Sequence, residues 1–234
     1  MFRPMKAGDL LPSWPTSLLV LCVLCVLPVP LAGCKKDAPG QEPGGDAPTP
    51  LELVYRQVPG SPLELGVPTT WDIEEVDPGP EPRAPRDGGP SADPTALELR
   101  SRTLLSVRAK EGALGSAGRP WLMVLHDPFL PAGTTSADYL AAQRASNHQA
   151  ARMEHVEAER SRRHGRPAYH VRDRWSLALG EREARMSQEA LLLLDARDEG
   201  MHGYAVVITL LEEDRRKLSR GIEEILGSVR FREE

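Results

Sequence analysis

Apolar and polar residues alternate along several short segments of the 234-residue chain, the pattern of β-strands that bury one face. Leu51–Tyr55, Leu63–Val67 and Thr70–Glu74 predict strands near a sheet edge, because prolines separate them. Leu97–Ala109 predicts one further strand or a hairpin. Trp121–Leu125 is apolar at every position, so it predicts a central strand that is covered on both faces.

The second half of the chain predicts two more strand pairs. Val156–Arg162 and Ala168–Trp175 flank a turn at residues 164–165 and alternate in polarity, which indicates a hairpin with one face in water. Met186–Leu194 and Tyr204–Leu210 are more continuously apolar. They predict a pair at the centre of the sheet, with residues 195–202 turning between them.

Two helices follow from capping and periodicity. Thr135–Asp138 places a hydroxyl before a carboxylate at capping spacing, so a helix is expected from Tyr139 to about Ala150. Leu218, Ile222, Ile225, Leu226 and Val229 form one apolar stripe, with Gly227 near the expected end of the helix and a short strand at Val229–Phe231 after it. Many antiparallel strands with two such helices predict a single α+β domain over residues 51–234, with both helices packed on an antiparallel sheet.

Three segments lack this patterning or show another one. Residues 77–94 hold six prolines and three glycines, which predicts a surface loop. Residues 34–50 contain no large apolar side chain and predict a disordered tether. Residues 1–33 combine a short basic start with an apolar run, as in an export signal.

The end of the apolar run, Leu31-Ala32-Gly33-Cys34, resembles a bacterial lipobox, in which the cysteine sulfur is acylated and becomes the new N-terminus. The alternative is a membrane-spanning helix. Ser17–Leu31 has 15 residues, fewer than the ~20 that a spanning helix needs, and prolines interrupt its end. The resemblance implies a cell-envelope lipoprotein held in a membrane by lipid on Cys34. Lysines rather than an aspartate follow Cys34, which favours the outer membrane.

Cysteine usage and charge exclude several classes of function. The three cysteines are Cys22, Cys25 and Cys34, so the chain after residue 34 cannot use thiol catalysis, zinc thiolates or iron–sulfur clusters. A net charge of −5 and an aromatic content of 5% give no basic field and few stacking surfaces for nucleic acid. No cofactor is predicted.

Four segments resemble the DcrB-like and PsbP-like domains, a superfamily that also includes a Ran-binding nuclear import factor. They are Leu65–Pro68 with Trp71, Ser136–Tyr139, Gly165–Tyr169 and Ile222–Phe231. The resemblance implies a sheet sandwiched by helices and used for docking rather than chemistry. Its members include exported lipoproteins and photosystem accessory subunits, so it does not choose a partner.

Residues that could carry chemistry are sparse. The six histidines, His126, His148, His155, His164, His170 and His202, lack the i, i+2 or i, i+4 spacing of metal ligands, so no metal site is predicted. Asp195–Gly200 resembles the start of a calcium loop but has Arg197 at the third position, which favours a polar turn. His126 and Asp127 follow a predicted central strand and could serve a hydrolase with Ser136, Ser146 or Ser176. No nucleophile elbow accompanies them, and a strand end with a turn is the preferred interpretation.

The densest basic cluster consists of Arg160, Arg162, Arg163 and Arg166 around the predicted hairpin turn. A guanidinium group binds phosphate or carboxylate through two parallel hydrogen bonds, so the cluster could contact an anionic envelope surface or an acidic protein. An ordinary solvated turn is the alternative. The favoured function is therefore a non-catalytic envelope lipoprotein that docks a protein or an envelope component, and a lipid-anchored hydrolase at His126 and Asp127 is the alternative.

Overall fold

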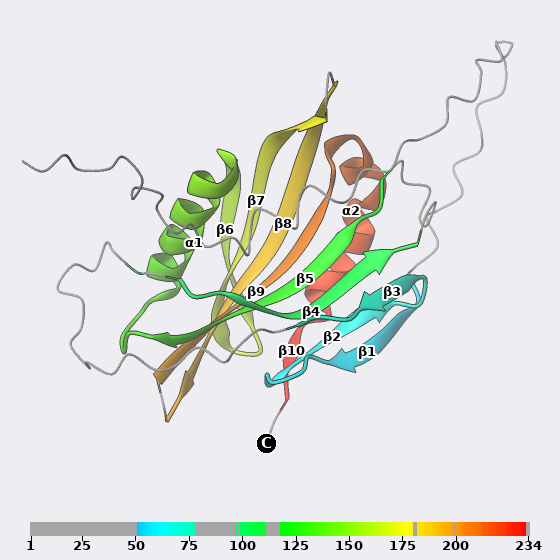
Figure 1. Ribbon diagram of the computed structural model, residues 1–234. Coiled ribbons are helices and arrows are strands. Elements are labelled where there is room, and N and C mark those ends of the chain that lie inside the picture. Colours follow the sequence, from blue (N-terminus) through cyan, green and yellow to red (C-terminus); the bar gives the residue numbers. More distant parts are fainter. Residues whose placement is uncertain are drawn as a thin grey trace, which may run out of the picture. The chain divides into compact units, whose positions relative to one another are not determined.

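Ten strands and two helices make up the part of the chain that the computed structural model describes, residues 51–77, 97, 99–110, 118–179, 182–198 and 200–232 (Figure 1). These residues belong to one compact unit, Gly44–Glu234. The expected export signal, Cys34, the tether and nearly all of the proline-rich loop lie outside the described residues. Neither helix in the described ranges has the length and apolar content needed to cross a bilayer.

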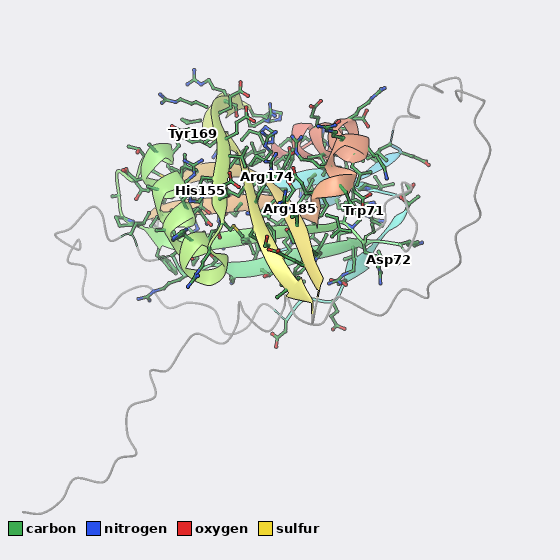
Figure 2. The ribbon with its side chains drawn as sticks, turned by 90° about the horizontal axis from the view of Figure 1, so that it is seen from above. Trp71, Asp72, His155, Tyr169, Arg174 and Arg185 are labelled. Atoms are coloured by element: carbon green, nitrogen blue, oxygen red, sulfur yellow. The ribbon has the colours of Figure 1, made fainter. Side chains whose placement is uncertain are left out.

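The larger sheet is antiparallel and has seven strands. In spatial order they are β3 (Trp71–Glu74), β4 (Arg102–Ala109), β5 (Trp121–Leu130), β9 (Gly200–Leu211), β8 (Arg182–Arg197), β7 (Arg166–Leu179) and β6 (Glu154–Arg163). Figure 2 shows the two ends of this order, with Trp71 and Asp72 at one and His155 and Tyr169 at the other. The apolar strands β8 and β9 lie inside the sheet, as their composition predicted.

The smaller sheet contains β1 (Leu53–Gln57), β2 (Leu63–Pro68) and β10 (Arg230–Phe231), with β2 in the middle. Its strands come from the two ends of the described chain. The prediction that the early strands lie near a sheet edge is confirmed for β1 and β3, the edge strands of the smaller and the larger sheet. It is wrong for β2, which pairs with β1 on one side and with the C-terminal strand β10 on the other.

Each face of the larger sheet has its own core. On one face, Leu191 and Val206 pack with Leu65 of the smaller sheet and Ile222 of α2 (Glu212–Gly227). On the other face, alternate residues of the same strands pack against Tyr139 and Leu140 of α1 (Ser136–Ala151). The helices therefore cover opposite faces of an antiparallel sheet, which confirms the predicted α+β class (Figure 1).

Both helices begin earlier than the apolar pattern suggested. Thr135 and Asp138 form the predicted capping box, and α1 begins at Ser136. The α2 helix starts at Glu212 with an acidic first turn, before its apolar stripe, and ends at Gly227 as expected. Acidic side chains in the first turn suit the positive end of the helix dipole, so this turn is helical although it holds no residue of the apolar stripe.

Strand ends were the less successful part of the prediction. The segment Leu97–Ala109 contains one strand among its described residues, and it begins at Arg102. The turn predicted over residues 195–202 is shorter than expected, since β8 continues to Arg197 and pairs residue by residue with β9 from Gly200. The turn predicted after Leu125 is also wrong, because β5 continues to Leu130.

Candidate functional site

Two polar side chains lie back to back on β5, inside the strand rather than at its end. His126 is 2% exposed and Asp127 is fully buried. Consecutive strand residues point to opposite faces of a sheet. His126 stands opposite Tyr204 on the α2 side, and Asp127 stands opposite Gly203 and contacts α1.

His126 is enclosed by polar groups from β4, β8 and β9. Arg102 Nε donates a hydrogen bond of 3.2 Å to His126 Nδ1, and His126 Nε2 lies 2.8 Å from His202 Nδ1. The imidazole is nearly parallel to the Tyr204 ring, with centroids 4.8 Å apart. Burial, followed by the charges of Arg102, His202 and Arg197, lowers the pKa of His126 from 6.5 to about 3. The side chain is therefore neutral at physiological pH.

The hydrogen bonds define where the protons of this histidine pair lie. Arg102 Nε can only donate, so His126 Nδ1 accepts and the single proton of the neutral ring is on Nε2. That proton is donated to His202 Nδ1. Both ring nitrogens of His126 are thus occupied by protein groups, and neither is available to activate a serine. The candidate serines lie on α1 and β7, where Ser136 is half-buried and Ser146 and Ser176 are exposed.

Asp127 is the centre of a second buried network, on the α1 side. Its Oδ1 accepts a hydrogen bond of 2.5 Å from Ser101 Oγ, and its Oδ2 accepts bonds of 2.7 Å from Tyr139 and 3.0 Å from Gln143. Burial raises the pKa of Asp127, while these three donors act to lower it. The pKa of Tyr139 is raised well above its usual value by burial and by the adjacent carboxyl group. The network joins α1 to the sheet.

A glycine makes this junction possible. A Cβ on Gly203 would lie 2.6 Å from the Tyr139 ring, so the ring rests directly on the β9 backbone. The register of β5 against β9 shifts between Asp127 and Leu130, and Phe129 has a positive φ of 59°. Such a bulge redirects side chains and is common beside functional groups. A glycine within an otherwise apolar strand was the signal in the sequence that could have located this close approach.

Asp195 connects Arg166, near the β6–β7 turn, with the polar groups around His126. Its carboxylate forms an ion pair with Arg166 and accepts a bond of 3.0 Å from Arg197 Nε. Arg197 Nη2 donates to the Tyr204 hydroxyl at 2.5 Å. The Arg166 guanidinium lies 3.9 Å from the centre of the Phe231 ring. Asp195 is therefore a buried structural acceptor within a strand rather than part of a polar turn.

The four arginines of the predicted basic cluster do not share one face. Ala168 of β7 packs into the core on the α2 side, and the cross-strand register puts Arg163 and Arg166 on that side with it. Arg160 and Arg162 alternate with these positions and lie on the α1 side, where both are exposed. The structure thus brings the four together in pairs and leaves Arg160 and Arg162 as the accessible pair.

Two further arginines of β7 are paired with acidic side chains. Arg172 Nη2 lies 3.4 Å from a Glu157 carboxylate oxygen, and Arg174 Nε lies 3.0 Å from Glu212 Oε1 of α2. Figure 2 shows Arg174 near the middle of the molecule rather than at the hairpin end. These two residues tie the β6–β7 hairpin and α2 to the sheet.

The other candidate sites are a possible metal site and a surface depression. Within the described residues, no three His, Cys, Asp or Glu side chains converge as a metal site would require. An open depression of about 720 Å³ lies between the start of β8 and the N-terminus of α2, and side chains of both signs line it, among them Arg185, Glu212 and Arg216. Mixed charge at an open surface indicates no particular ligand.

No protein-family model matches the chain, and no curated protein matches it. Similar solved structures include the PsbP protein CyanoP of Synechocystis sp. PCC 6803, with 13% identity, a TM-score of 0.48, and coverage of 82% of this chain and 98% of that one. LpqN of Mycobacterium tuberculosis, described as involved in cell envelope biogenesis, has 11% identity, a TM-score of 0.47, and coverage of 78% and 92%. The Ran-binding protein Mog1p of Saccharomyces cerevisiae has 9% identity, a TM-score of 0.43, and coverage of 77% and 96%.

A PsbP protein and a Ran-binding protein are thus among the similar structures. With identities of 9 to 13%, the functions of these proteins do not carry over to this chain.

Proposed function

We propose that this chain is a cell-envelope lipoprotein, attached to the outer membrane by lipid on Cys34, whose folded domain is a non-catalytic module that docks a protein or another envelope component. The lipobox-like tetrad before Cys34 and the short apolar run that precedes it support the anchor. At ~0.8 kcal/mol for each buried methylene group, two or more acyl chains suffice for stable attachment.

The observation that carries the docking role is how the polar groups of β5 are used. His126 and Asp127 are the groups that resemble catalytic residues most, and both are buried and hydrogen-bonded to other parts of the protein. A catalytic group must reach its substrate directly or through one water. These two residues instead fix α1 and the neighbouring strands in place, which suits a rigid scaffold that presents a surface.

The point where the tether enters the domain also suits an anchored module. Leu51 N donates a hydrogen bond of 3.1 Å to Glu224 Oε2, and the Leu51 side chain lies against Gly221 of α2. The entry point is therefore secured on the α2 side of the sheet. Arg160 and Arg162 are exposed on the opposite side, and we assign the contact with an anionic envelope component to this pair.

Metabolic labelling tests the anchor. Cells that express the protein are grown with labelled palmitate, and Cys34→Ala is compared with the native chain and with Cys22→Ala. We expect label in the native chain and in Cys22→Ala, and none in Cys34→Ala, because Cys34 is the acceptor that a lipobox would use. Equal labelling of the Cys34 variant would contradict the proposal.

Crosslinking in the intact envelope tests the docking role. We expect the native protein to be recovered with an envelope protein or polysaccharide, and the Cys34→Ala variant to lose that product because it is no longer held at the membrane. Turnover of an ester or amide substrate that stops when His126 is replaced would instead support the hydrolase.

A further inference from the structure

Strand β1 is the least protected edge in the described chain. It pairs with β2 on one side only, and Val54 and Tyr55 are two of its large apolar side chains, exposed by 39% and 47%. A strand edge with free backbone groups and apolar side chains is a template for a further strand. Figure 1 shows β1 at the outer margin of the smaller sheet.

The other edges of the two sheets carry features that block pairing. β6 has a bulge between His155 and Glu157 and is rich in charged residues, and β3 has only four residues, two of them acidic. β10 has two residues. Bulges, charges and short length are the devices by which edge strands avoid association. β1 has no proline and no bulge, and its only charged residue is Arg56.

The backbone of β1 shows which of its groups point outward. Thr69 N donates to Glu52 O, and Val58 N donates to Leu63 O, so even-numbered residues of this strand face β2. Inward and outward groups alternate along a strand in an antiparallel sheet. The N–H and C=O groups of Leu53, Tyr55 and Gln57 therefore point away from β2, toward a strand that would lie alongside.

The sequence of this edge is complementary to itself. In an antiparallel pair of two copies centred on Val54, Leu53 of each copy stands opposite Tyr55 of the other, and their outward groups can exchange hydrogen bonds. In the same register, Glu52 of each copy stands opposite Arg56 of the other, at two equivalent places. Opposite charges placed directly across strands stabilise the pair.

The neighbouring register lacks this complementarity. If the pair were centred on Tyr55, Arg56 would stand opposite Val54, and Glu52 would stand opposite Val58, which is fully buried. The charges of β1 therefore distinguish one register from the next.

We propose that β1 is a self-association surface, and that two copies of this chain pair their β1 strands antiparallel about Val54 to form a continuous six-stranded sheet from the two smaller sheets. The contact is isologous, so each copy uses the edge that the other uses and the assembly stops at a dimer. Val54 of the two copies meet on the face where Leu65 and Val67 are buried, which extends the apolar core across the junction.

Disulfide trapping tests the register. The full chain is prepared in detergent with serine at residues 22, 25 and 34, and Val54→Cys is compared with Tyr55→Cys and with Ile73→Cys, an exposed position on β3. Directly opposed residues in such a pair have Cα atoms ~4.5 Å apart, within the range that a disulfide spans. We expect covalent dimers from Val54→Cys at least tenfold faster than from either control. Equal rates for all three, or no dimer from Val54→Cys, would overturn the proposal.

Charge reversal tests complementarity in the same background. Adding Glu52→Arg to Val54→Cys places like charges at two positions, and we expect the trapping rate to fall by about tenfold. Adding Arg56→Glu as well restores opposite charges, and the rate should recover. A trapping rate that stays the same after both changes would overturn the register selected by charge. Circular dichroism checks that each variant is folded. Because no lipid is present, these results are independent of the proposed anchor.

Discussion

Acid should destabilise this fold through His126, and the effect can be isolated with one substitution. The pKa of His126 is lowered from 6.5 to about 3 in the folded protein, first by burial and then by Arg102, His202 and Arg197. The unfolded chain therefore binds a proton more readily than the folded one below pH ~6.5. The stability that depends on the neutral ring is fully present above that pH and is lost as the pH falls toward 3.

The magnitude follows from linkage. Each pH unit between the two pKa values corresponds to about 1.4 kcal/mol, so the whole interval amounts to roughly 4–5 kcal/mol. That is a large part of the ~5–15 kcal/mol by which domains are stable. The substitution His126→Gln keeps one acceptor and one donor for Arg102 and His202 but does not titrate.

Urea unfolding followed by circular dichroism at pH 7, 6, 5 and 4 measures the effect. We expect the free energy of unfolding of the native protein to fall more steeply with acid than that of His126→Gln, by up to about 1.4 kcal/mol per pH unit. The matched control is His148→Gln, at an exposed position on α1, and it should follow the native protein. Parallel curves for the native protein and His126→Gln would refute the assignment of a buried neutral imidazole, whatever the stability of the variant at pH 7.

Two further predictions concern the α1 junction and the exposed arginines. Gly203→Ala should lower the free energy of unfolding by about 1–3 kcal/mol, because its Cβ would collide with the Tyr139 ring, whereas Gly227→Ala meets no neighbour and should cost little in a urea titration. Similar effects of the two alanines would contradict the close approach. Changing Arg160 and Arg162 to glutamine should abolish salt-sensitive cosedimentation with anionic envelope polysaccharide and leave the melting temperature nearly unchanged, because both side chains are exposed. Cosedimentation that persists in the double variant, or that does not change with salt concentration, would count against this surface.

Local pattern in the sequence was sufficient for the elements and the class of fold. The capping box at Thr135, the apolar stripe of α2 and its end at Gly227 depend on residues within one or two helical turns. The apolar composition of β8 and β9 was enough to predict their central position in the sheet. Such features need no knowledge of distant partners, because capping and amphipathic burial act over a few residues.

Tertiary structure decided what the polar residues do. His126 and Asp127 stood out in the sequence, but their partners were not visible there, since His202 is 76 positions away from His126. The pairing of β2 with the C-terminal β10 and the split of the arginines between two faces were hidden for the same reason. Strand register sets which distant side chains meet, and a shift of one residue moves a side chain to the other face of the sheet. Register depends on the packing of the whole sheet, so only the assembled fold determines it.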